Sequence, residues 1–432
     1  MTTGSGGRGG SRPLHLSELL RRPITDKAGG SIGRLSDVIV RLRGDEYPVV
    51  TGLVATVGSR SVFVPIEQVT DLDRPELRLT SARLDLRHFE RRNGEVLLRA
   101  DVLGHRLLDV DSAHLIRAAD LELADQVGEW VVTGVDSHRR PPRLLRSLAG
   151  SGDTDHAFRE WAKFEPLIGH TGSALLRSPF GRIRRLKPAQ IADLLEGASR
   201  AEETEILGQV HADPELEADV FEELEEDLAT RLLGARTDTE IAQVLARMRA
   251  DDAADAITEL PQRRRQSVLD LLPAGQRTKV LTLMGFNPAS AGGLMGVDFV
   301  ALPATASVAQ AVASVAAAAG QQPEALTSVH AVDDRGRLSG VAKLVLLVQA
   351  NPHAELGDVC ESDPVRVGAE TDVVDVAVLM SDYNLITIPV VDEHRVMIGL
   401  ITVDDILEAA LPEDWRRREA ADPPDAHHGD KD

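Results

Sequence analysis

The chain has 432 residues, a formal net charge of −21 at pH 7 and one cysteine, Cys360. One cysteine excludes an internal disulfide and fits a reducing compartment, so we expect a cytoplasmic location. No apolar run reaches the roughly 18–20 residues that a membrane-spanning helix needs, so we expect at most a peripheral place on the inner face of the membrane. The length predicts about three domains of roughly 150 residues each.

The negative charge is concentrated in one part of the chain. Residues 12–150 hold 21 Lys and Arg against 20 Asp and Glu, whereas residues 188–260 hold 5 against 20. A surface this acidic repels nucleic acid and attracts cations. The charge pattern therefore excludes a nucleic-acid partner and favours a metal ion or a basic protein.

The first part of the chain predicts a tail followed by β-structure. Residues 1–13 are rich in Gly, Ser and Arg without an apolar centre, which indicates a disordered tail and not a signal peptide. Between residues 14 and 147, short apolar or alternating runs are separated by Gly-containing turn signals. The phrase Val-Val-Thr-Gly occurs at residues 49–52 and again at residues 131–134. Two copies of a small β-barrel are the simplest interpretation.

One phrase of this region carries a family resemblance. Residues 27–37, which include Gly-Gly-Ser-Ile-Gly-Arg-Leu-Ser-Asp, resemble the PRC-barrel family, and residues 102–109 keep only Gly104 and the apolar spacing. The resemblance implies a PRC-barrel-like region over residues 14–147. No nucleophile–base pair is evident in it, so a barrel that serves protein contacts is at least as well supported as a catalytic one.

Residues 148–186 predict a linker with a basic segment. Pro141 and Pro142, just before it, exclude helix and sheet. Residues 177–187 carry five Lys and Arg and no acid, a composition compatible with binding of phosphate or anionic lipid. The segment has no apolar anchor, so an exposed loop that balances the acidic region after it is the simpler interpretation.

Residues 187–296 predict an all-α domain of short helices. Apolar residues recur at i, i+3 and i+4 spacing, and prolines stand where helices are expected to begin. A phrase with Ala-Asp followed by apolar residues occurs at residues 192–196, 218–222 and 254–257. Repeated short helices of this kind predict a superhelical stack in which each pair buries its face on the next.

The last part of the chain contains a duplication. Val332-Asp333 recurs as Val391-Asp392, 59 residues later, and the flanking glycines and apolar residues keep the same offset. A repeat of this length indicates two copies of one βαββα-like unit, at residues 297–350 and 351–411.

The pattern Gly-x-x-Thr-x-x-Asp in the second copy resembles that of tandem CBS domains. Thr402 is placed to cap a helix that starts near residue 403. In the CBS family, the residues at the positions of Thr402 and Asp405 contact an adenosine nucleotide, so the resemblance implies a site for ATP or another adenosine nucleotide. Lys343 and Leu346 replace them in the first copy, which implies at most one such site per chain. CBS pairs commonly pack face to face, so a homodimer is also implied.

Residues 187–411 as a whole resemble the cytosolic part of the MgtE magnesium channels. The order of helical domain, junction and CBS pair matches, as does the Ala-Gly-Gly-Leu-Met junction at residues 291–295. The resemblance implies that Mg²⁺ binds between opposed acids of the helical domain and the CBS pair, an arrangement that suits an ion holding one or two carboxylates plus waters. The acids matched by position are Asp251, Asp255, Asp372, Asp405 and Glu408.

Together these features predict a multidomain α+β protein that regulates and does not catalyse. We expect a magnesium-sensing protein without a transmembrane segment, whose output partner is a membrane transporter or a cytosolic protein. Two alternatives stay open: a sensor of adenosine nucleotides, and a scaffold whose acidic surface binds a basic partner. Residues 412–432 are polar and predict a second disordered tail.

Overall fold

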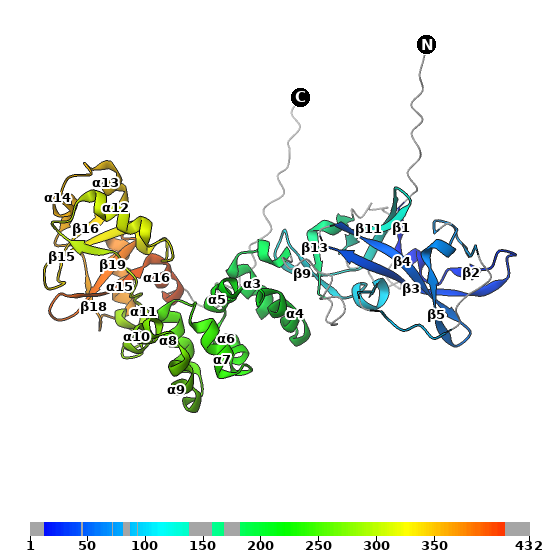
Figure 1. The fold of residues 1–432 in the computed structure, drawn as a ribbon, viewed down its shortest axis with the longest axis horizontal. Coiled ribbons are helices and arrows are strands. Elements are labelled where there is room, and N and C mark those ends of the chain that lie inside the picture. Colours follow the sequence, from blue (N-terminus) through cyan, green and yellow to red (C-terminus); the bar gives the residue numbers. More distant parts are fainter. Residues whose placement is uncertain are drawn as a thin grey trace, which may run out of the picture. The chain divides into compact units, whose positions relative to one another are not determined.

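The chain divides into two compact units, residues 1–225 and 226–432. Figure 1 labels many of the helices and strands of both. The predicted tails at residues 1–13 and 412–432, apart from Pro13, and the Pro141-Pro142 stretch lie outside the described residues. The computed structural model describes residues 13–44, 46–70, 72–80, 87–92, 94–137, 158–167 and 182–410.

The first unit is built on one curled sheet, which has ten strands within the described residues. The two longest strands, β3 (Ser31–Arg43) and β4 (Glu46–Val57), form an antiparallel pair (Figure 1). The strand order is β1-β10-β11-β4-β3-β2-β6, with β12, β5 and β7 paired to β11, β4 and β3. The remaining strands are β1 (Leu14–His15), β2 (Pro23–Thr25), β5 (Arg60–Pro65), β6 (Leu77–Arg78), β7 (Val96–Leu97), β10 (Asp120–Gln126), β11 (Glu129–Asp136) and β12 (Arg159–Glu160).

The two predicted β copies share this sheet because each gives its first elements to the other. Asp37 in β3 accepts hydrogen bonds from the amides of Arg99 (2.7 Å) and Ala100 (3.1 Å), in the π-helical turn η2 (Leu98–Val102) of the second copy. Asp120 in β10, 83 residues after Asp37, accepts one from the amide of Ser17 (3.0 Å), in α1 (Leu16–Leu19) of the first copy. Ser17 also precedes Ala100 by 83 residues, so the two sets of contacts are reciprocal.

One hydrophobic core therefore serves both copies. It joins Leu16 and Val38 of the first copy to Leu98 and Leu121 of the second. The sequence repeat is present in the fold, but its copies share one interlocked sheet and do not form two separate barrels; residues 106–109 and 114–117 of the second copy lie in a separate three-stranded sheet. The physical reason is that the first strand of each copy pairs with a long strand of the other: β1 pairs with β10, and β7 pairs with β3.

The structure corrects the linker predicted at residues 148–186, because residues 158–167 belong to the fold. Strands β12 and β13 (Phe164–Pro166) flank the 3₁₀-helix η3 (Trp161–Lys163), and Trp161 and Phe164 are buried in the common core. Strand β13 pairs with β8 (Arg106–Asp109), which pairs with β9 (His114–Arg117). Two aromatic anchors in so short a segment give no strand periodicity, so the sequence could not reveal them.

The part of the basic segment that the structure describes, residues 182–187, makes contacts within the first unit. Arg182, in the 3₁₀-helix η4 (Arg182–Arg185), is buried and donates to the carbonyl oxygen of Phe164, while Arg184 pairs with Asp213. Arg106 likewise joins the β region to the helices through Glu202. These contacts favour a structural role over lipid binding for residues 182–185. The helices of this unit are α3 (Pro188–Glu196), α4 (Arg200–Val210) and α5 (Pro214–Glu222).

The turn between β10 and β11 gives a testable prediction about stability. Val127 and Gly128 both have positive φ, 57° and 89°, and the Val127 side chain is fully exposed. A β-branched residue is strained at positive φ, whereas Asn-Gly is the preferred pair for such a hairpin turn. We expect Val127→Asn to raise the free energy of unfolding by about 1 kcal/mol. Val127→Thr keeps the β-branch, so a comparable gain in that control during chemical denaturation would contradict the explanation.

Short helices continue in the second unit, and the predicted helix starts are confirmed. Pro261 and Pro273 immediately precede α9 and α10, as Pro188 and Pro214 open α3 and α5 in the first unit, at positions where the missing N–H costs nothing. Helix α8 packs on α6, α9 and α10. These helices are α6 (Glu226–Gly234), α7 (Asp238–Leu245), α8 (Ala250–Glu259), α9 (Gln262–Leu271), α10 (Ala274–Leu283) and α11 (Ala291–Leu294).

The predicted 59-residue repeat is seen as two small sheets with matching elements, of order β14-β15-β16-β17 and β18-β19-β20 among the described residues. The first copy contains β14 (Ala301–Pro303), α12 (Val308–Ala317), η5 (Ala325–Thr327), β15 (Ser328–Val332), β16 (Leu338–Lys343) and α13 (Leu344–Gln349). It is followed by α14 (Leu356–Val359), β17 (Glu361–Ser362), β18 (Val367–Gly368), α15 (Val373–Asp382), β19 (Thr387–Val391), β20 (Met397–Thr402) and α16 (Val403–Ala410).

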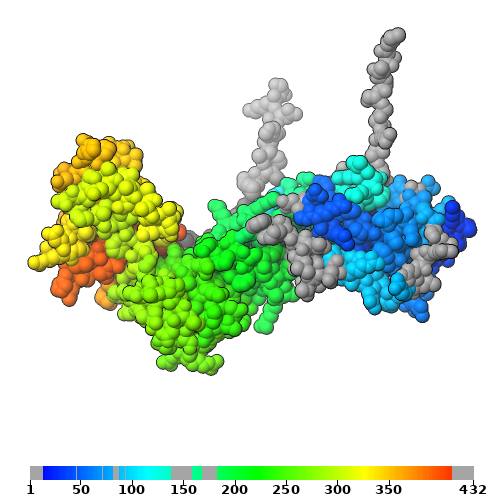
Figure 2. Space-filling model, in the orientation of Figure 1, coloured from blue at the N-terminus to red at the C-terminus, as the bar shows by residue number. Residues whose placement is uncertain are grey.

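The two copies meet through residues that are equivalent in the repeat. The hydroxyls of Ser328 and Thr387, 59 residues apart, lie 2.9 Å from each other. The amide of Leu338 donates to the Arg395 carbonyl, and the amide of Met397 donates to the Gly336 carbonyl, which is the same contact seen from the other copy. In the space-filling view the orange and red residues of the second copy lie directly against the yellow residues of the first (Figure 2).

The junction after the helices attaches to the second copy, although the first copy follows it in sequence. Gly296 and Leu400 exchange backbone hydrogen bonds of 2.9 Å in both directions, and the amide of Gly292 donates to the Ala369 carbonyl. Met295 is buried against Gly399, where an added Cβ would lie only 2.4 Å from the Met295 sulfur. The helical segment and the second copy are therefore held together by hydrogen bonds between backbone groups.

Candidate functional site

The predicted acids of α8 and α16 come together in the second unit. The N-terminal turns of both helices carry acidic residues, where the helix dipole favours negative charge. Figure 1 shows α16 beside α8. Asp251 and Asp255 lie four residues apart on α8, so they share one face, and Asp405 and Glu408 lie three residues apart on α16. The sequence alone placed these residues in different domains, and the fold makes them neighbours.

Asp405 is held in place by Thr402. One carboxylate oxygen of Asp405 accepts hydrogen bonds from the amide (2.8 Å) and the hydroxyl (2.9 Å) of Thr402, and both residues are buried. The amide of Asp405 donates in return to the Thr402 hydroxyl at 3.3 Å. This reciprocal cap confirms the predicted helix start at residue 403.

Arg249 connects the two helices. It stands at the N-cap of α8, and its guanidinium donates to Asp252 at 2.6 Å and to the second carboxylate oxygen of Asp405 at 3.4 Å. Only 7% of the Asp405 side chain is exposed, so this charge is largely removed from water. Both oxygens of the Asp405 carboxylate are thus engaged by protein groups.

The acids perturb one another. Burial is the main cause that raises the pKa of Asp251; Asp405 raises this pKa further, while Arg249 opposes the shift. Burial also raises the pKa of Asp255 to about 6, with further contributions, in decreasing order, from the carboxylates of Asp251, Glu226, Glu259 and Glu408. The Asp255 side chain keeps an exposed face, so the atoms around it dehydrate the carboxyl group without enclosing it. A raised carboxylate pKa means that negative charge is unfavourable here unless a cation accompanies it.

The pKa of Asp405 is raised as well, first by burial. The hydrogen bonds from Thr402 and the charge of Arg249 lower it, and Asp404 raises it. The Asp405 carboxylate therefore depends on these donors to stay ionised.

Asp372, the remaining predicted metal ligand, has a different position. It is the N-cap of α15 and accepts a hydrogen bond from the amide of Val374 at 2.9 Å. Its backbone bridges to Ser290 of the junction. The structure therefore brings together Asp251, Asp255, Asp405 and Glu408, and gives Asp372 a capping role beside the junction.

The acids of α8 and α16 do not form an enclosed metal site within the described residues. Within the residues that the structure describes, no three His, Cys, Asp or Glu side chains are arranged to hold a metal ion among them. Mg²⁺ commonly uses one or two protein carboxylates and keeps several waters. Asp251, Asp255 and Glu408 carry carboxylate oxygens of this type, and the raised pKa values of Asp251 and Asp255 mean that uncompensated negative charge on these two residues is unfavourable.

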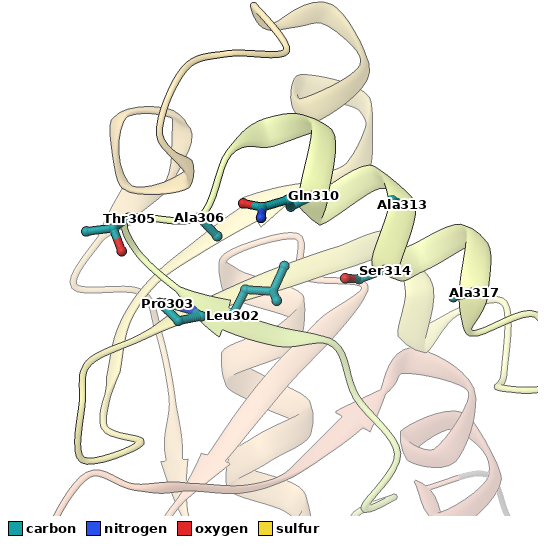
Figure 3. A pocket seen from close by; sticks show the side chains of 8 residues that line it. All are labelled: Leu302, Pro303, Thr305, Ala306, Gln310, Ala313, Ser314 and Ala317. Carbon is teal, nitrogen blue, oxygen red and sulfur yellow. The ribbon is translucent and has the colours of Figure 1, made fainter.

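The first copy lacks the polar cap that the second has. Lys343 stands at the N-cap of α13 without a side-chain cap, and Leu346 is 45% exposed. A solvent-open pocket of about 610 Å³ does occur in this copy, between β14 and α12. Its lining is mostly small or apolar, with Thr305, Gln310 and Ser314 as polar residues, and it contains no predicted site residue (Figure 3). This pocket is distinct from the position equivalent to Thr402 and Asp405.

Sequence reasoning missed Arg249. The available signal was its position: an arginine directly before an acidic helix N-terminus opposes the helix dipole, which is unusual unless the side chain has another partner. That partner, Asp405, is 156 residues away in the sequence.

In this part of the chain, short helices are joined through a junction to a pair of repeated β/α units. Residues 186–289 match the family model of the MgtE intracellular N domain, and residues 356–412 match that of the CBS domain. This part of the chain is homologous to the cytosolic domains of MgtE proteins, and the matched families are regulatory domains and not enzymes. The β-rich first unit agrees with the predicted PRC-barrel-like region.

Among curated relatives, the magnesium transporter MgtE of Thermus thermophilus is 35% identical over 181 residues, which are 40% of this chain and 40% of the relative. The magnesium transporter MgtE of Bacillus subtilis is 26% identical over 195 residues, 45% of this chain and 43% of the relative. The chain thus matches about two fifths of the length of these relatives. Within the described residues, no helix is long and apolar enough to cross a membrane.

One solved structure agrees in fold over half of the chain. It is described as the cytosolic domain of the Mg²⁺ channel MgtE in complex with ATP. Its sequence identity is 27% and its TM-score 0.50, and the match covers 52% of this chain and 92% of that one.

Proposed function

We propose that the chain is a magnesium-responsive regulatory module in which Mg²⁺ binds between α8 and α16. The observation that carries this proposal is the convergence of Asp251 and Asp255 with Asp405 and Glu408 at a partly dehydrated place. The homology to magnesium transporters gives the module a reason to respond to this ion.

Binding would change the balance between two arrangements of α8 and α16. Without the ion, carboxylates a few ångströms apart repel by several kcal/mol at intermediate dielectric, so the approach of the helices is costly. With the ion, Asp255 and Glu408 gain a shared cation that keeps most of its waters. Because Mg²⁺ would bind only the closed arrangement, it would shift the population towards it.

The test is a calorimetric titration with Mg²⁺ combined with thermal melts at constant ionic strength. We expect the melting temperature of the wild type to rise with Mg²⁺ by mass action, and the rise to shrink strongly in Asp251→Ala/Asp255→Ala. Asp358→Asn, an exposed acid on α14, is the matched control and should respond as the wild type does. A wild type indifferent to millimolar Mg²⁺ would refute the proposal, and a full response in the double variant would refute the choice of ligands.

A second candidate function is the sensing of an adenosine nucleotide at Thr402 and Asp405. The homologous solved structure contains ATP, and the second copy keeps the Thr–Asp pair in a buried cap. A nucleotide that used the Asp405 carboxylate would have to displace Arg249 from it.

Nucleotide stoichiometry gives a further prediction. We expect at most one molecule of ATP to bind per chain, because Lys343 and Leu346 of the first copy offer no equivalent carboxylate. Equilibrium dialysis with labelled ATP measures the stoichiometry directly, and Asp405→Ala should abolish the binding. Saturation at two per chain, or binding unchanged in Asp405→Ala, would show that the assignment is wrong.

In this proposal the module acts on its target through protein–protein contacts, in the cytoplasm or at the inner face of the membrane. Exposed apolar side chains on α13 (Val345 and Val348) and on α15 (Val374 and Val378) would suit the homodimer expected of CBS pairs. The target would be a membrane transporter or a cytosolic protein. A scaffold that uses only the acidic surface remains the alternative if neither Mg²⁺ nor nucleotide binds.

A further inference from the structure

The strongest unexplained feature of the second unit is the position of Arg249. It is the N-cap of α8 but makes no side-chain cap, and a cation at this end of a helix opposes the dipole. Its guanidinium instead lies between Asp252 of its own helix and Asp405 at the start of α16. About a quarter of the Arg249 side chain is exposed, so the group lies within the interface of the two helices and not on an open surface.

The contacts of Arg249 form a continuous chain from one helix to the other. Asp252 is bound at 2.6 Å and Asp405 at 3.4 Å, and Asp405 is itself fixed by Thr402 at 2.8 and 2.9 Å. The same guanidinium also acts electrostatically on Asp251, opposing the effect of burial and of Asp405. A single side chain thus supplies positive charge to the acids at the place where a metal ion is proposed to bind.

We propose that Arg249 is a tethered cation that competes with Mg²⁺ for the acids between α8 and α16. This inference rests on the proposed function and deepens it, because it makes Arg249 a residue that sets the metal affinity of that site. A carboxylate oxygen that accepts from Arg249 is lost to the ion, and a fixed positive charge beside Asp251 repels an incoming divalent cation. Metal binding then becomes an exchange of one cation for another.

Two consequences follow for the module. Without metal, Arg249 holds α8 near α16 and limits the repulsion between their acids, so the module does not depend wholly on Mg²⁺ for its shape. With metal, the ion must displace or outweigh the guanidinium, so the site responds at a higher Mg²⁺ concentration than the carboxylates alone would set. Arg249 in this view is a positioning residue and not a ligand.

The test compares wild type, Arg249→Gln and Arg249→Lys in calorimetric Mg²⁺ titrations and in melts with and without Mg²⁺. Arg249→Gln removes the charge and keeps a polar side chain, and we expect it to bind Mg²⁺ on the order of tenfold more tightly, the effect of a partly buried charge. Its melting temperature without metal should fall, and saturating Mg²⁺ should restore it to the wild-type value. Arg249→Lys keeps the charge, so it should retain an affinity near that of the wild type. Arg277→Gln, which breaks the Arg277–Asp270 pair (2.7 Å) on neighbouring helices, is the matched control and should leave Mg²⁺ affinity unchanged.

The outcomes separate this inference from the proposed function. Mg²⁺ binding of equal affinity in wild type and Arg249→Gln, with melting temperatures lowered equally with and without metal, would overturn the inference and leave the magnesium site standing. Tight binding by Arg249→Gln alone would support the inference and overturn magnesium sensing by the wild type. Absence of binding in every variant, Arg249→Lys included, would overturn both.

Discussion

Replacing Asp120 by alanine is expected to destabilise the first unit by about 3–5 kcal/mol. Asp120 is completely buried, and its carboxylate accepts from the Ser17 amide (3.0 Å), the Ser17 hydroxyl and the Leu121 amide (2.9 Å). Alanine leaves these donors buried without an acceptor, and each unsatisfied donor costs about 1–3 kcal/mol. The loss should appear as a lower free energy of unfolding in denaturant titrations followed by tryptophan fluorescence.

Two further variants test the reason for that loss. Asp120→Asn keeps one acceptor oxygen, so it should cost less than alanine but more than a surface change. Asp125→Asn is the control, because Asp125 accepts from the Gly128 amide in an exposed turn. By the reciprocal geometry, Asp37→Ala should cause a loss similar to that of Asp120→Ala, since Asp37 accepts from the amides of Arg99, Ala100 and Val38. A loss below about 1 kcal/mol in both alanine variants would contradict the interlocked arrangement.

Acidification from pH 7 to pH 4 is expected to destabilise the wild type more than a His330→Gln variant, by about 3 kcal/mol. His330 is completely buried in β15; its Nδ1 lies 3.1 Å from the Val300 carbonyl oxygen, and its buried Nε2 has no hydrogen-bond partner among the described residues. Burial lowers the pKa of His330 from the ordinary 6.5 to about 4, and the Val300 contact opposes this shift. The folded state therefore holds the neutral ring, while the unfolded state takes up a proton below about pH 6.5.

The sign of the effect follows from this difference in proton uptake. Between pH 6.5 and pH 4 the unfolded chain binds more protons at His330 than the folded chain does, so stability falls as pH falls. The difference between a pKa of 6.5 in the unfolded chain and about 4 in the folded chain corresponds to about 3 kcal/mol, most of which is lost by pH 4. Denaturant titrations at several pH values give the difference between wild type and variant, and NMR of the imidazole gives the pKa directly. A constant difference across this range, or an imidazole that titrates near 6.5, would contradict the prediction.

The sequence predicted those parts of the fold that depend on the spacing of residues close together in the chain. The 59-residue duplication is visible because both copies keep the same turns, and Pro188 and Pro214 open helices at the positions where proline costs nothing. Thr402 was recognised as a cap because the acceptor and the amides it serves are neighbours in the chain. Signals of this kind need no knowledge of tertiary structure.

The parts that the sequence hid depend on partners far away in the chain. Arg249 meets Asp405 across 156 residues, and Ser17 meets Asp120 across 103. Trp161 anchors a segment that appeared to be a linker, because one aromatic residue carries no period. For the candidate site, the family pattern indicated the acids, but it said nothing of the arginine that lies among them.

Because the contacts of Asp37 and Asp120 are reciprocal, the two repeats of the β region depend on each other to fold. Neither repeat can fully satisfy its own buried carboxylate, because Asp37 also accepts from the turn of the second copy and Asp120 from the helix of the first. A polypeptide carrying a single repeat would find the missing amides only on another molecule, which is the geometry of an exchanged dimer. The duplicated gene segment thus covalently joins what would otherwise be two chains. If the chain is cut between the two repeats, each fragment alone should fail to form the sheet. The two fragments should form it when they are mixed.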